Sequence, residues 1–347
     1  MKFLVIRFSS IGDIVLTTPV VRCLKKQIAS SEIHYLTKSN YNQIVSSNPY
    51  IDKVHYLENS LREVINEIQH EDYDYIIDLH HNMRSFKVKE ALGKESFSFE
   101  KLNVQKWVYT NFKLNMLPPL HIVDRYMKTV ESMGVVNDGA GLDYFIPEAD
   151  RLKETDIPTS HQAGYIGIVI GAALNTKKYP MNKLKRLCEM IDHPIILLGG
   201  LEDADEGERI ATVDSIKVYN ACGKFNLNES ADLVRRAKLI VTNDTGLMHI
   251  ATAFKRPTIT LWGNTVPEFG MYPYYGENYL HHYAKGGENG SRQLPYDILE
   301  VRNLKCRPCS KIGYDKCPKG HFKCMEMIDP KAIAEKIHQR LYQAAAI

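Results

Sequence analysis

Polar residues that can bind a phosphate or move a proton gather in several short segments of this 347-residue chain. The first segment, residues 7–13, follows an apolar run and ends in Gly12 and Asp13. Gly12 permits a tight turn, and the carboxylate of Asp13 can accept a proton from a hydroxyl group. General base catalysis of this kind contributes about 10²- to 10⁴-fold in rate. The alternative is that Asp13 only caps the next helix, and this segment taken alone favours capping.

The second segment, residues 171–180, carries Lys177 after a buried apolar run. Its small residues would let the backbone approach a phosphate, and the lysine would neutralise the phosphate charge. The segment lacks the Gly-Lys-Ser/Thr core of a P-loop and the Gly-x-Gly-x-x-Gly pattern of a dinucleotide site. A solvated basic turn explains it about equally well.

The strongest signal is residues 242–251, which run from a strand end through a turn into a helix. Amides at a helix N-terminus, together with the positive end of the helix dipole, suit a diphosphate. A plain capping turn is the alternative. The candidate ligand-binding residues are Asp244, Thr245, Gly246, Leu247 and His249.

Two further strand ends carry polar turns. Gly263 and Thr265 follow one apolar run, and Glu202 follows Gly199 and Gly200 after another. An acidic residue at such a position can accept both hydroxyls of a ribose. The sequence therefore places candidate ligand contacts after several successive strands.

Four cysteines lie close together near the end of the chain: Cys306, Cys309, Cys317 and Cys324, with His321 between the last two. The spacing predicts a structural Zn²⁺ site or, less favoured, an iron–sulfur cluster. The second pair is not Cys-x2-Cys, so the pattern is not a regular zinc ribbon. Free thiols or a redox-sensitive pair are the alternative. We expect no catalytic role for these residues.

Strands alternate with helices along the chain, which predicts parallel sheets covered by helices on both faces. The expected strands are residues 2–7, 32–37, 53–56, 73–79, 165–170, 195–198, 217–219, 239–242 and 258–262. The expected helices are residues 14–27, 41–46, 60–68, 182–191, 203–211, 229–236, 247–253 and 329–342. Pro19 indicates either a kink in the first helix or a helix that starts near residue 17 or 18.

The pattern breaks near residues 147–163, where prolines and polar residues interrupt it. We therefore expect α/β domains over residues 1–155 and 156–328, followed by a C-terminal helix over residues 329–347. Ligands of open parallel sheets bind beyond the carboxyl ends of the strands. Two such domains that face each other would form a cleft between the candidate segments.

The bulk composition excludes several classes of protein. The net charge of +3 is too small to indicate a nucleic-acid-binding protein. We find no signal-peptide pattern and no apolar stretch of membrane-spanning length, which predicts a cytoplasmic protein. Seven scattered cysteines do not form a disulfide framework.

Three motifs together resemble a known family. They are Ile-Arg-Phe-Ser-Ser-Ile-Gly-Asp-Ile-Val-Leu-Thr-Thr-Pro at residues 6–19, Asn-Asp-Thr-Gly-Leu-Met-His-Ile-Ala at residues 243–251, and Trp-Gly-Asn-Thr-x-Pro at residues 262–267. In this order, and over nearly the whole chain, they resemble the ADP-heptose:lipopolysaccharide heptosyltransferases of glycosyltransferase family nine.

The resemblance implies a GT-B fold, in which two Rossmann-like domains face each other. It also implies an inverting transfer that requires no metal or other cofactor. Asp13 would be the general base, Lys177 a phosphate ligand and Glu202 a ribose contact. The donor loop would consist of Asp244, Thr245, Gly246, Leu247 and His249. The chain departs from the family pattern at Ala172, Ala173 and Tyr179, which leaves the donor sugar less well defined than the reaction.

On the acceptor side, Arg84 follows a predicted strand end, and His121 and Arg125 lie in a segment that resembles one that meets anionic acceptor groups in the family. Ordinary surface arginines are the alternative. The implied partners are ADP-heptose and a lipid-linked saccharide, with peripheral contact at the inner face of the cytoplasmic membrane. A transferase for a UDP- or dTDP-hexose and a non-catalytic nucleotide-sugar-binding protein stay open. The missing glycine fingerprint disfavours a nicotinamide dehydrogenase.

Overall fold

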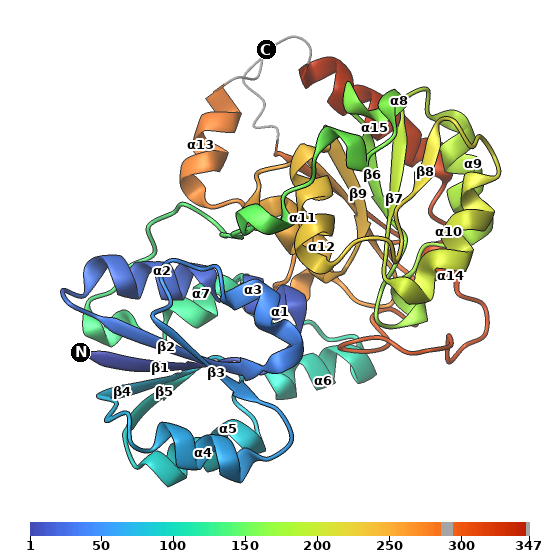
Figure 1. Cartoon of the computed structure of the whole chain (residues 1–347). Helices are drawn as coiled ribbons and strands as arrows, with labels where there is room; N and C mark the ends of the chain where they lie inside the picture. Colours follow the sequence, from blue (N-terminus) through green and yellow to red (C-terminus); the bar gives the residue numbers. More distant parts are fainter. Residues whose placement is uncertain (286–293, 345–347) are drawn as a thin grey trace.

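Two parallel β-sheets organise the computed structural model, which describes residues 1–285 and 294–344 (Figure 1). The first sheet has the strand order β3-β2-β1-β4-β5, and the second has the order β11-β10-β9-β6-β7-β8. All strand pairs in both sheets are parallel. The carboxyl ends of the strands in each sheet therefore meet along one edge.

The first domain contains five strands and seven α-helices among the described residues. Its strands are β1 (Lys2–Ile6), β2 (Glu32–Lys38), β3 (Lys53–Leu57), β4 (Tyr75–Asp78) and β5 (Glu95–Ser98). Its helices are α1 (Ile11–Val15), α2 (Thr18–Gln27), α3 (Asn42–Val45), α4 (Leu61–Ile68), α5 (Met83–Leu92), α6 (Asn103–Phe112) and α7 (Ile122–Met127).

The second domain is built in the same way around six described strands. These are β6 (Ile166–Val169), β7 (Ile195–Leu198), β8 (Val218–Asn220), β9 (Leu239–Asn243), β10 (Thr258–Trp262) and β11 (Tyr296–Glu300). Its helices are α8 (Thr159–Gln162), α9 (Met181–Met190), α10 (Ala204–Ala211), α11 (Leu227–Arg236), α12 (Gly246–Ala253), α13 (Glu277–Lys285), α14 (Lys323–Glu326) and α15 (Pro330–Ala344). The predicted domain boundary falls in the short turn Glu154–Asp156, between the two sheets.

The nine predicted strands are confirmed within a few residues. The predicted helix over residues 14–27 is in fact two helices, α1 and α2. Pro19 lies in the first turn of α2, where its missing N–H costs nothing. The sequence did not predict β5, α5, α6, α7, α8, α13, β11 or α14. The strands among them are short and only partly buried, so they lack a continuous apolar run.

Buried apolar side chains join the two domains. One cluster contains Val5 and Tyr126 of the first domain together with Leu233 and Ile250 of the second. Another cluster, with Leu4 and Ile76, lies under α4 and α5 on the opposite face of the first sheet. A continuous core between the domains favours one preferred arrangement over free rotation.

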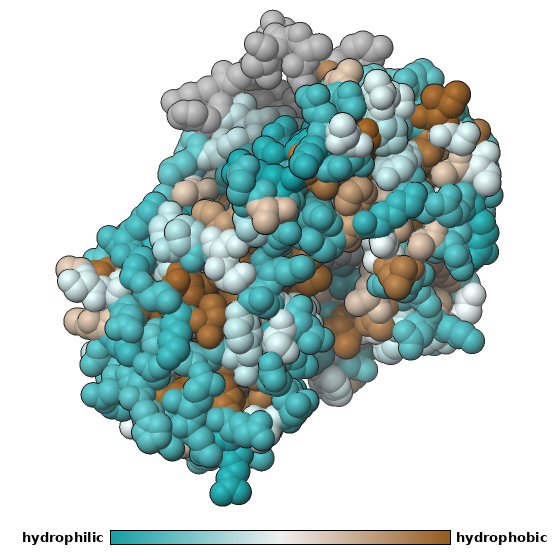
Figure 2. All heavy atoms as spheres, in the orientation of Figure 1, coloured by the Kyte–Doolittle hydropathy of each residue, from teal (hydrophilic) through white to brown (hydrophobic). Residues whose placement is uncertain are grey.

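The C-terminal helix α15 packs on the second sheet, where Ile333 and Ile337 enter its core cluster. Residues 345–347 of the predicted helix lie outside the described part of the chain. Among the described residues, no helix is both long and apolar enough to cross a membrane. Figure 2 shows one face of the molecule as mostly hydrophilic, with small hydrophobic patches over both domains.

Candidate active site

Asp13 lies near the N-terminus of the short helix α1, directly beyond the carboxyl end of β1. Its Oδ1 is 2.7 Å from Nη2 of Arg7, and its Oδ2 accepts a 2.8 Å hydrogen bond from the Ser10 hydroxyl. Burial raises the pKa of Asp13, but the charge of Arg7 and the Ser10 hydrogen bonds outweigh burial and lower it overall. The carboxylate is therefore ionised at neutral pH. It caps α1 and is also able to accept a proton.

The start of α1 lies against the start of α12 in the other domain. A Cβ atom on Gly12 would lie 2.6 Å from Cδ2 of His249, and one on Gly246 would lie 2.7 Å from Cγ2 of Ile11. Only glycine at both positions lets the two segments approach this closely without a shift. This contact brings Asp13 of the first domain beside the predicted donor loop of the second.

His249 is buried at this contact, with 2% of its surface exposed. Burial lowers its pKa to about 4, although the charges of Asp244 and Asp13 act in the opposite direction. The imidazole is therefore neutral at physiological pH. Its Nδ1 is buried and has no hydrogen-bond partner among the described residues.

Lys177, Asp244 and Thr265, predicted from three separate segments, converge at one point. Nζ of Lys177 lies 2.7 Å from Oδ2 of Asp244, and the Thr265 hydroxyl donates a 2.9 Å hydrogen bond to the same oxygen. The three residues follow β6, β9 and β10, which are neighbours in the sheet. The parallel order of these strands is what assembles the group.

The N-terminus of α12 is not closed by a side chain. Thr245 occupies the N-cap position, but its side chain makes no capping hydrogen bond. The plain capping turn considered from the sequence is therefore not what the structure shows at Thr245. The first amides of α12, at Gly246 and Leu247, remain open to an anionic ligand.

Glu202 is exposed in the turn Leu201–Asp203, and its role as a ribose ligand stays a prediction. The neighbouring Asp203, which sequence reasoning missed, is buried and organises this part of the site. It lies 2.5 Å from Nζ of Lys178 and accepts a 3.0 Å hydrogen bond from the amide of Gly200. A Cβ on Gly171 would lie 2.2 Å from its Oδ2, so Asp203 links the turns after β6 and β7.

The arginine Arg307 supports the turn that contains Gly263 and Thr265. Its Nε donates a 2.6 Å hydrogen bond to the carbonyl of Gly263, and Nη2 donates a 2.9 Å bond to the carbonyl of Thr265. Its Nη1 lies 2.7 Å from Glu300. The local sequence did not predict this role, because Arg307 lies in the cysteine-rich segment, far along the chain from the turn that it supports.

The three predicted acceptor residues have different surroundings. Arg84 is exposed at the start of α5 and lines a surface groove together with Lys38, Lys87 and Glu58. In contrast, Arg125 is buried, and its guanidinium donates to the carbonyls of Glu100 and Phe269. The last carbonyl belongs to the second domain, so Arg125 joins the domains.

His121 is also buried between the domains. Its Nδ1 accepts a hydrogen bond from the amide of Val123, so Nε2 carries the proton and donates to the carbonyl of Tyr272 at 2.9 Å. Burial lowers its pKa to about 3. Both ring nitrogens are engaged within the protein, so in this geometry neither is free for an acceptor.

Two lysines near Asp13 were missed from the sequence. Lys101 and Lys106 follow β5, a strand that was itself not predicted. Burial, together with the positive charge of Arg125, lowers the pKa of Lys106 to about 8. Burial and the charge of Arg7 likewise lower the pKa of Lys101. This concentration of positive charge beside a candidate base suits an anionic acceptor.

Two Rossmann-like domains with ligand-type residues at facing strand ends define the GT-B class of glycosyltransferases. The structure of a family 9 glycosyltransferase from Veillonella parvula aligns with a TM-score of 0.75 at 24% identity, covering 99% of this chain and 97% of that chain. The structure of E. coli ADP-heptose lps heptosyltransferase II aligns with a TM-score of 0.72 at 18% identity, covering 99% and 100%. These likenesses show that the fold is shared.

Sequence comparison identifies the family. Lipopolysaccharide heptosyltransferase 1 of Campylobacter coli is 27% identical over 296 residues, which are 76% of this chain and 84% of that protein. The family model of glycosyltransferase family 9 (heptosyltransferase) matches residues 61–287. The chain belongs to this family and is a glycosyltransferase.

Proposed function

We propose that this enzyme transfers a heptose from ADP-heptose to a saccharide of the lipopolysaccharide core. The names of the Campylobacter coli and E. coli relatives support this substrate pair. The observation that carries the proposal is the contact between Gly12 and His249, which places the ionised Asp13 beside the donor loop. An acceptor hydroxyl and a sugar donor would meet at this contact.

In the proposed reaction, Asp13 removes the proton from the acceptor hydroxyl as its oxygen attacks the anomeric carbon. The bond from that carbon to the diphosphate breaks, and ADP leaves with the bonding electrons. Lys177 and the open amides of α12 stabilise the charge that develops on the diphosphate. A single displacement inverts the anomeric configuration. Because a lysine and a helix terminus meet the leaving group, the chemical step needs no metal ion.

The acceptor in this proposal carries anionic groups. Lys101 and Lys106 beside Asp13 would bind a carboxylate or a phosphate of the core saccharide. Arg84, with Lys38 and Lys87, lines a groove further from Asp13 and would take a second anionic group of the same acceptor. The negative charge of a bound acceptor would offset the repulsion between the positive charges of these lysines.

Calorimetric titration with ADP, UDP and dTDP tests the donor assignment. We expect ADP to bind most tightly, and Lys177→Ala to weaken ADP binding about 10- to 100-fold, because one charge-assisted hydrogen bond contributes about 1.5–3 kcal/mol. Arg186→Ala, on the exposed side of α9, is the matched control and should leave binding unchanged. A preference for UDP or dTDP would overturn the ADP-heptose assignment. Failure of all three nucleotides to bind would overturn the proposed transfer.

We also propose that α6 and the segment after it touch the inner face of the cytoplasmic membrane, where a lipid-linked acceptor resides. Large apolar side chains are exposed there, including Val104 at 72%, Trp107 at 53% and Phe112 at 62%. Lysines flank them, which favours an anionic bilayer surface. Flotation with anionic vesicles should decrease for the double variant Trp107→Ala, Phe112→Ala. The control Ile216→Ala removes an equally exposed side chain of the second domain. Absence of binding by the wild-type chain would contradict this contact.

A further inference from the structure

A long segment between β11 and α14, residues 301–322, contains no helix or strand. Segments of more than about 12–15 residues without secondary structure are uncommon inside compact domains. Few of its side chains enter an apolar core, since only Val301 and Phe322 pack at its ends against the second cluster. Something other than hydrophobic burial has to order this segment.

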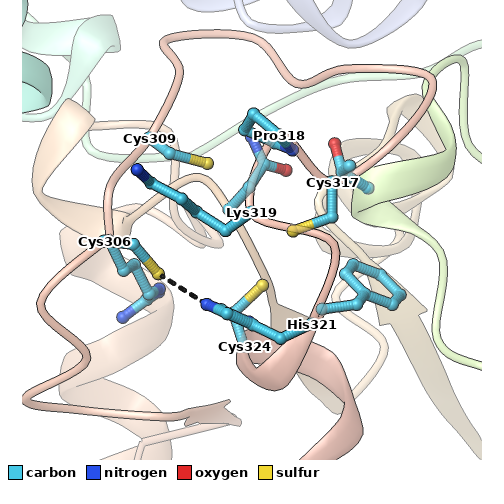
Figure 3. A pocket seen from close by; sticks show the side chains of 11 residues that line it. Cys306, Cys309, Cys317, Pro318, Lys319, His321 and Cys324 are labelled. Carbon is cyan, nitrogen blue, oxygen red and sulfur yellow. Dashed lines mark hydrogen bonds between the residues drawn. The ribbon is translucent and has the colours of Figure 1, made fainter.

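The four cysteines of this region line a single small pocket, which is partly open to solvent. Figure 3 shows the side chains of Cys306, Cys309, Cys317 and Cys324 around this pocket, with their sulfur atoms turned toward its interior. All four are free thiols; three lie at separate positions in the irregular segment and Cys324 lies in α14. Four cysteine sulfurs turned toward one pocket indicate a shared ligand.

His321 completes this arrangement as a hydrogen-bond donor. Its Nδ1 accepts a 3.1 Å hydrogen bond from the amide of Lys323, so the proton resides on Nε2. Nε2 lies 3.7 Å from Sγ of Cys306 and donates to that sulfur (Figure 3). An N–H group directed at a cysteine sulfur stabilises the thiolate form that metals bind.

The charge of the segment also fits a cluster of thiolates. Residues 305–324 contain six lysines and arginines and one aspartate. Lys319 and Arg307 line the pocket itself. Four thiolates around a divalent cation carry a net negative charge, which these basic residues would offset.

We propose that Cys306, Cys309, Cys317 and Cys324 bind one structural zinc ion as thiolates. Four sulfur ligands leave no open coordination position, so the ion is structural and takes no part in the transfer reaction. Binding replaces the four thiol protons, which pass to solvent. The site is independent of which donor or acceptor the enzyme uses.

Zinc binding must draw the sulfur atoms together. In a tetrahedral shell with Zn–S bonds of about 2.3 Å, sulfurs lie about 3.8 Å apart. Across the part of the chain that the structure describes, the one group of three potential ligand atoms within 4.8 Å of one another is His34, His55 and Glu71. The cysteine sulfurs are spaced more widely than the ligand atoms of that group.

The ring nitrogens of His34 and His55, however, already bond to each other and to Tyr73. These bonds satisfy the nitrogens without an ion.

The irregular segment, residues 301–322, also supports the candidate active site through hydrogen bonds. Besides the bonds from Arg307 to Gly263 and Thr265, the amide of Cys309 donates to the carbonyl of Asn264 at 3.2 Å. Tyr314 and Thr176 exchange hydrogen bonds through their main chains and the Thr176 hydroxyl. Loss of the ion should therefore weaken donor binding, although no cysteine would touch the donor.

Elemental analysis of the full chain, purified without a metal-binding tag, tests the site. We expect about one zinc per chain. The double variant Cys306→Ser, Cys317→Ser should lose it, whereas Cys222→Ala, which changes a buried cysteine elsewhere in the same domain, should keep it. His321→Gln should also keep zinc but release it faster to a chelator, because a donor to one thiolate is lost.

Titration of the wild-type chain with a mercurial reagent provides a measurement that does not depend on a folded variant. Zinc should leave in step with the modification of four thiols. A wild-type chain without zinc after expression in zinc-supplemented medium would overturn the proposal. Zinc retained by the double variant would also overturn it, and iron in place of zinc would overturn the identity of the ion.

Discussion

The carboxylate of Asp13 lies 2.7 Å from the guanidinium of Arg7, the residue that directly follows β1. Arg7 is itself held by the carbonyl of Leu79 and the hydroxyl of Tyr126. The ion pair keeps the candidate base charged in a partly buried position, where burial alone would favour the protonated form. The strength of this ion pair sets the pH range in which Asp13 can accept a proton.

Replacing Asp13 with asparagine should lower kcat about 10²- to 10⁴-fold, because the variant cannot take the hydroxyl proton. ADP affinity should stay within a factor of two or three, since Asp13 belongs to the first domain, which we propose to bind the acceptor. Steady-state kinetics and ADP calorimetry on the same preparation check both expectations. Near-normal turnover by Asp13→Asn would remove this residue from the reaction.

The Arg7→Gln variant should shift the acidic limb of the pH–rate profile to higher pH. Removing the guanidinium charge raises the pKa of Asp13, so the base is lost at a less acidic pH. Arg7→Lys retains the charge and should keep the limb close to that of the wild type. If the limb is the same in all three proteins, it reports some other group.

Acceptor binding should weaken as pH rises through about 8, the pKa of Lys106. Above that pH the lysine loses its charge, so an anionic acceptor loses one partner. We expect the acceptor KM to rise several-fold between pH 7 and pH 9 in the wild type. Lys106→Arg stays charged over this range and should show a flatter profile, whereas an equally steep rise in this variant would exclude Lys106 as the cause.

Gly12→Ala should damage both stability and turnover. The new Cβ would lie 2.6 Å from His249, so the contact between α1 and α12 has to open. Overpacking of this kind costs about 1–3 kcal/mol. Thermal unfolding and kcat should fall together, while ADP binding to the second domain is affected less. Wild-type turnover would show that the domains do not approach this closely during the reaction.

The protein should lose stability as pH falls below about 6.5. Burial lowers the pKa of His80 to about 4, of His121 to about 3 and of His249 to about 4, against about 6.5 in an unfolded chain. The folded protein thus binds fewer protons than the unfolded chain in this range. Each histidine contributes stability that is complete above pH 6.5 and is lost as pH falls toward its folded pKa, by about 1.4 kcal/mol per pH unit.

Denaturant unfolding at a series of pH values measures this slope. The slope should become shallower in His121→Gln, because one of the buried titrating groups is gone. His70→Gln removes an exposed histidine and serves as the control. An unchanged slope in His121→Gln would mean that folding does not shift the pKa of His121.

Much of the fold follows from local sequence patterns. Continuous apolar runs such as residues 2–6 and 239–243 become strands buried on both faces, and polar turns with Gly12 or Gly246 follow them. β5 and β11 were missed because their residues are only partly buried at the sheet edges. Edge strands have one paired neighbour and need less apolar surface, so their composition resembles that of loops.

The sequence by itself determined the two-domain α/β architecture, the strand ends that bear Asp13, Lys177 and Asp244, and the presence of a cysteine cluster. Only the tertiary structure decided which charges meet. Arg7 faces Asp13, Lys178 faces Asp203, and Arg307 supports a turn 42 to 44 residues earlier in the chain. The physical reason is that hydrophobic periodicity reports the burial of each element. Crossover connections then bring strand ends that are distant in the sequence to one edge of the sheet. The order of the strands at that edge decides which charged side chains become neighbours.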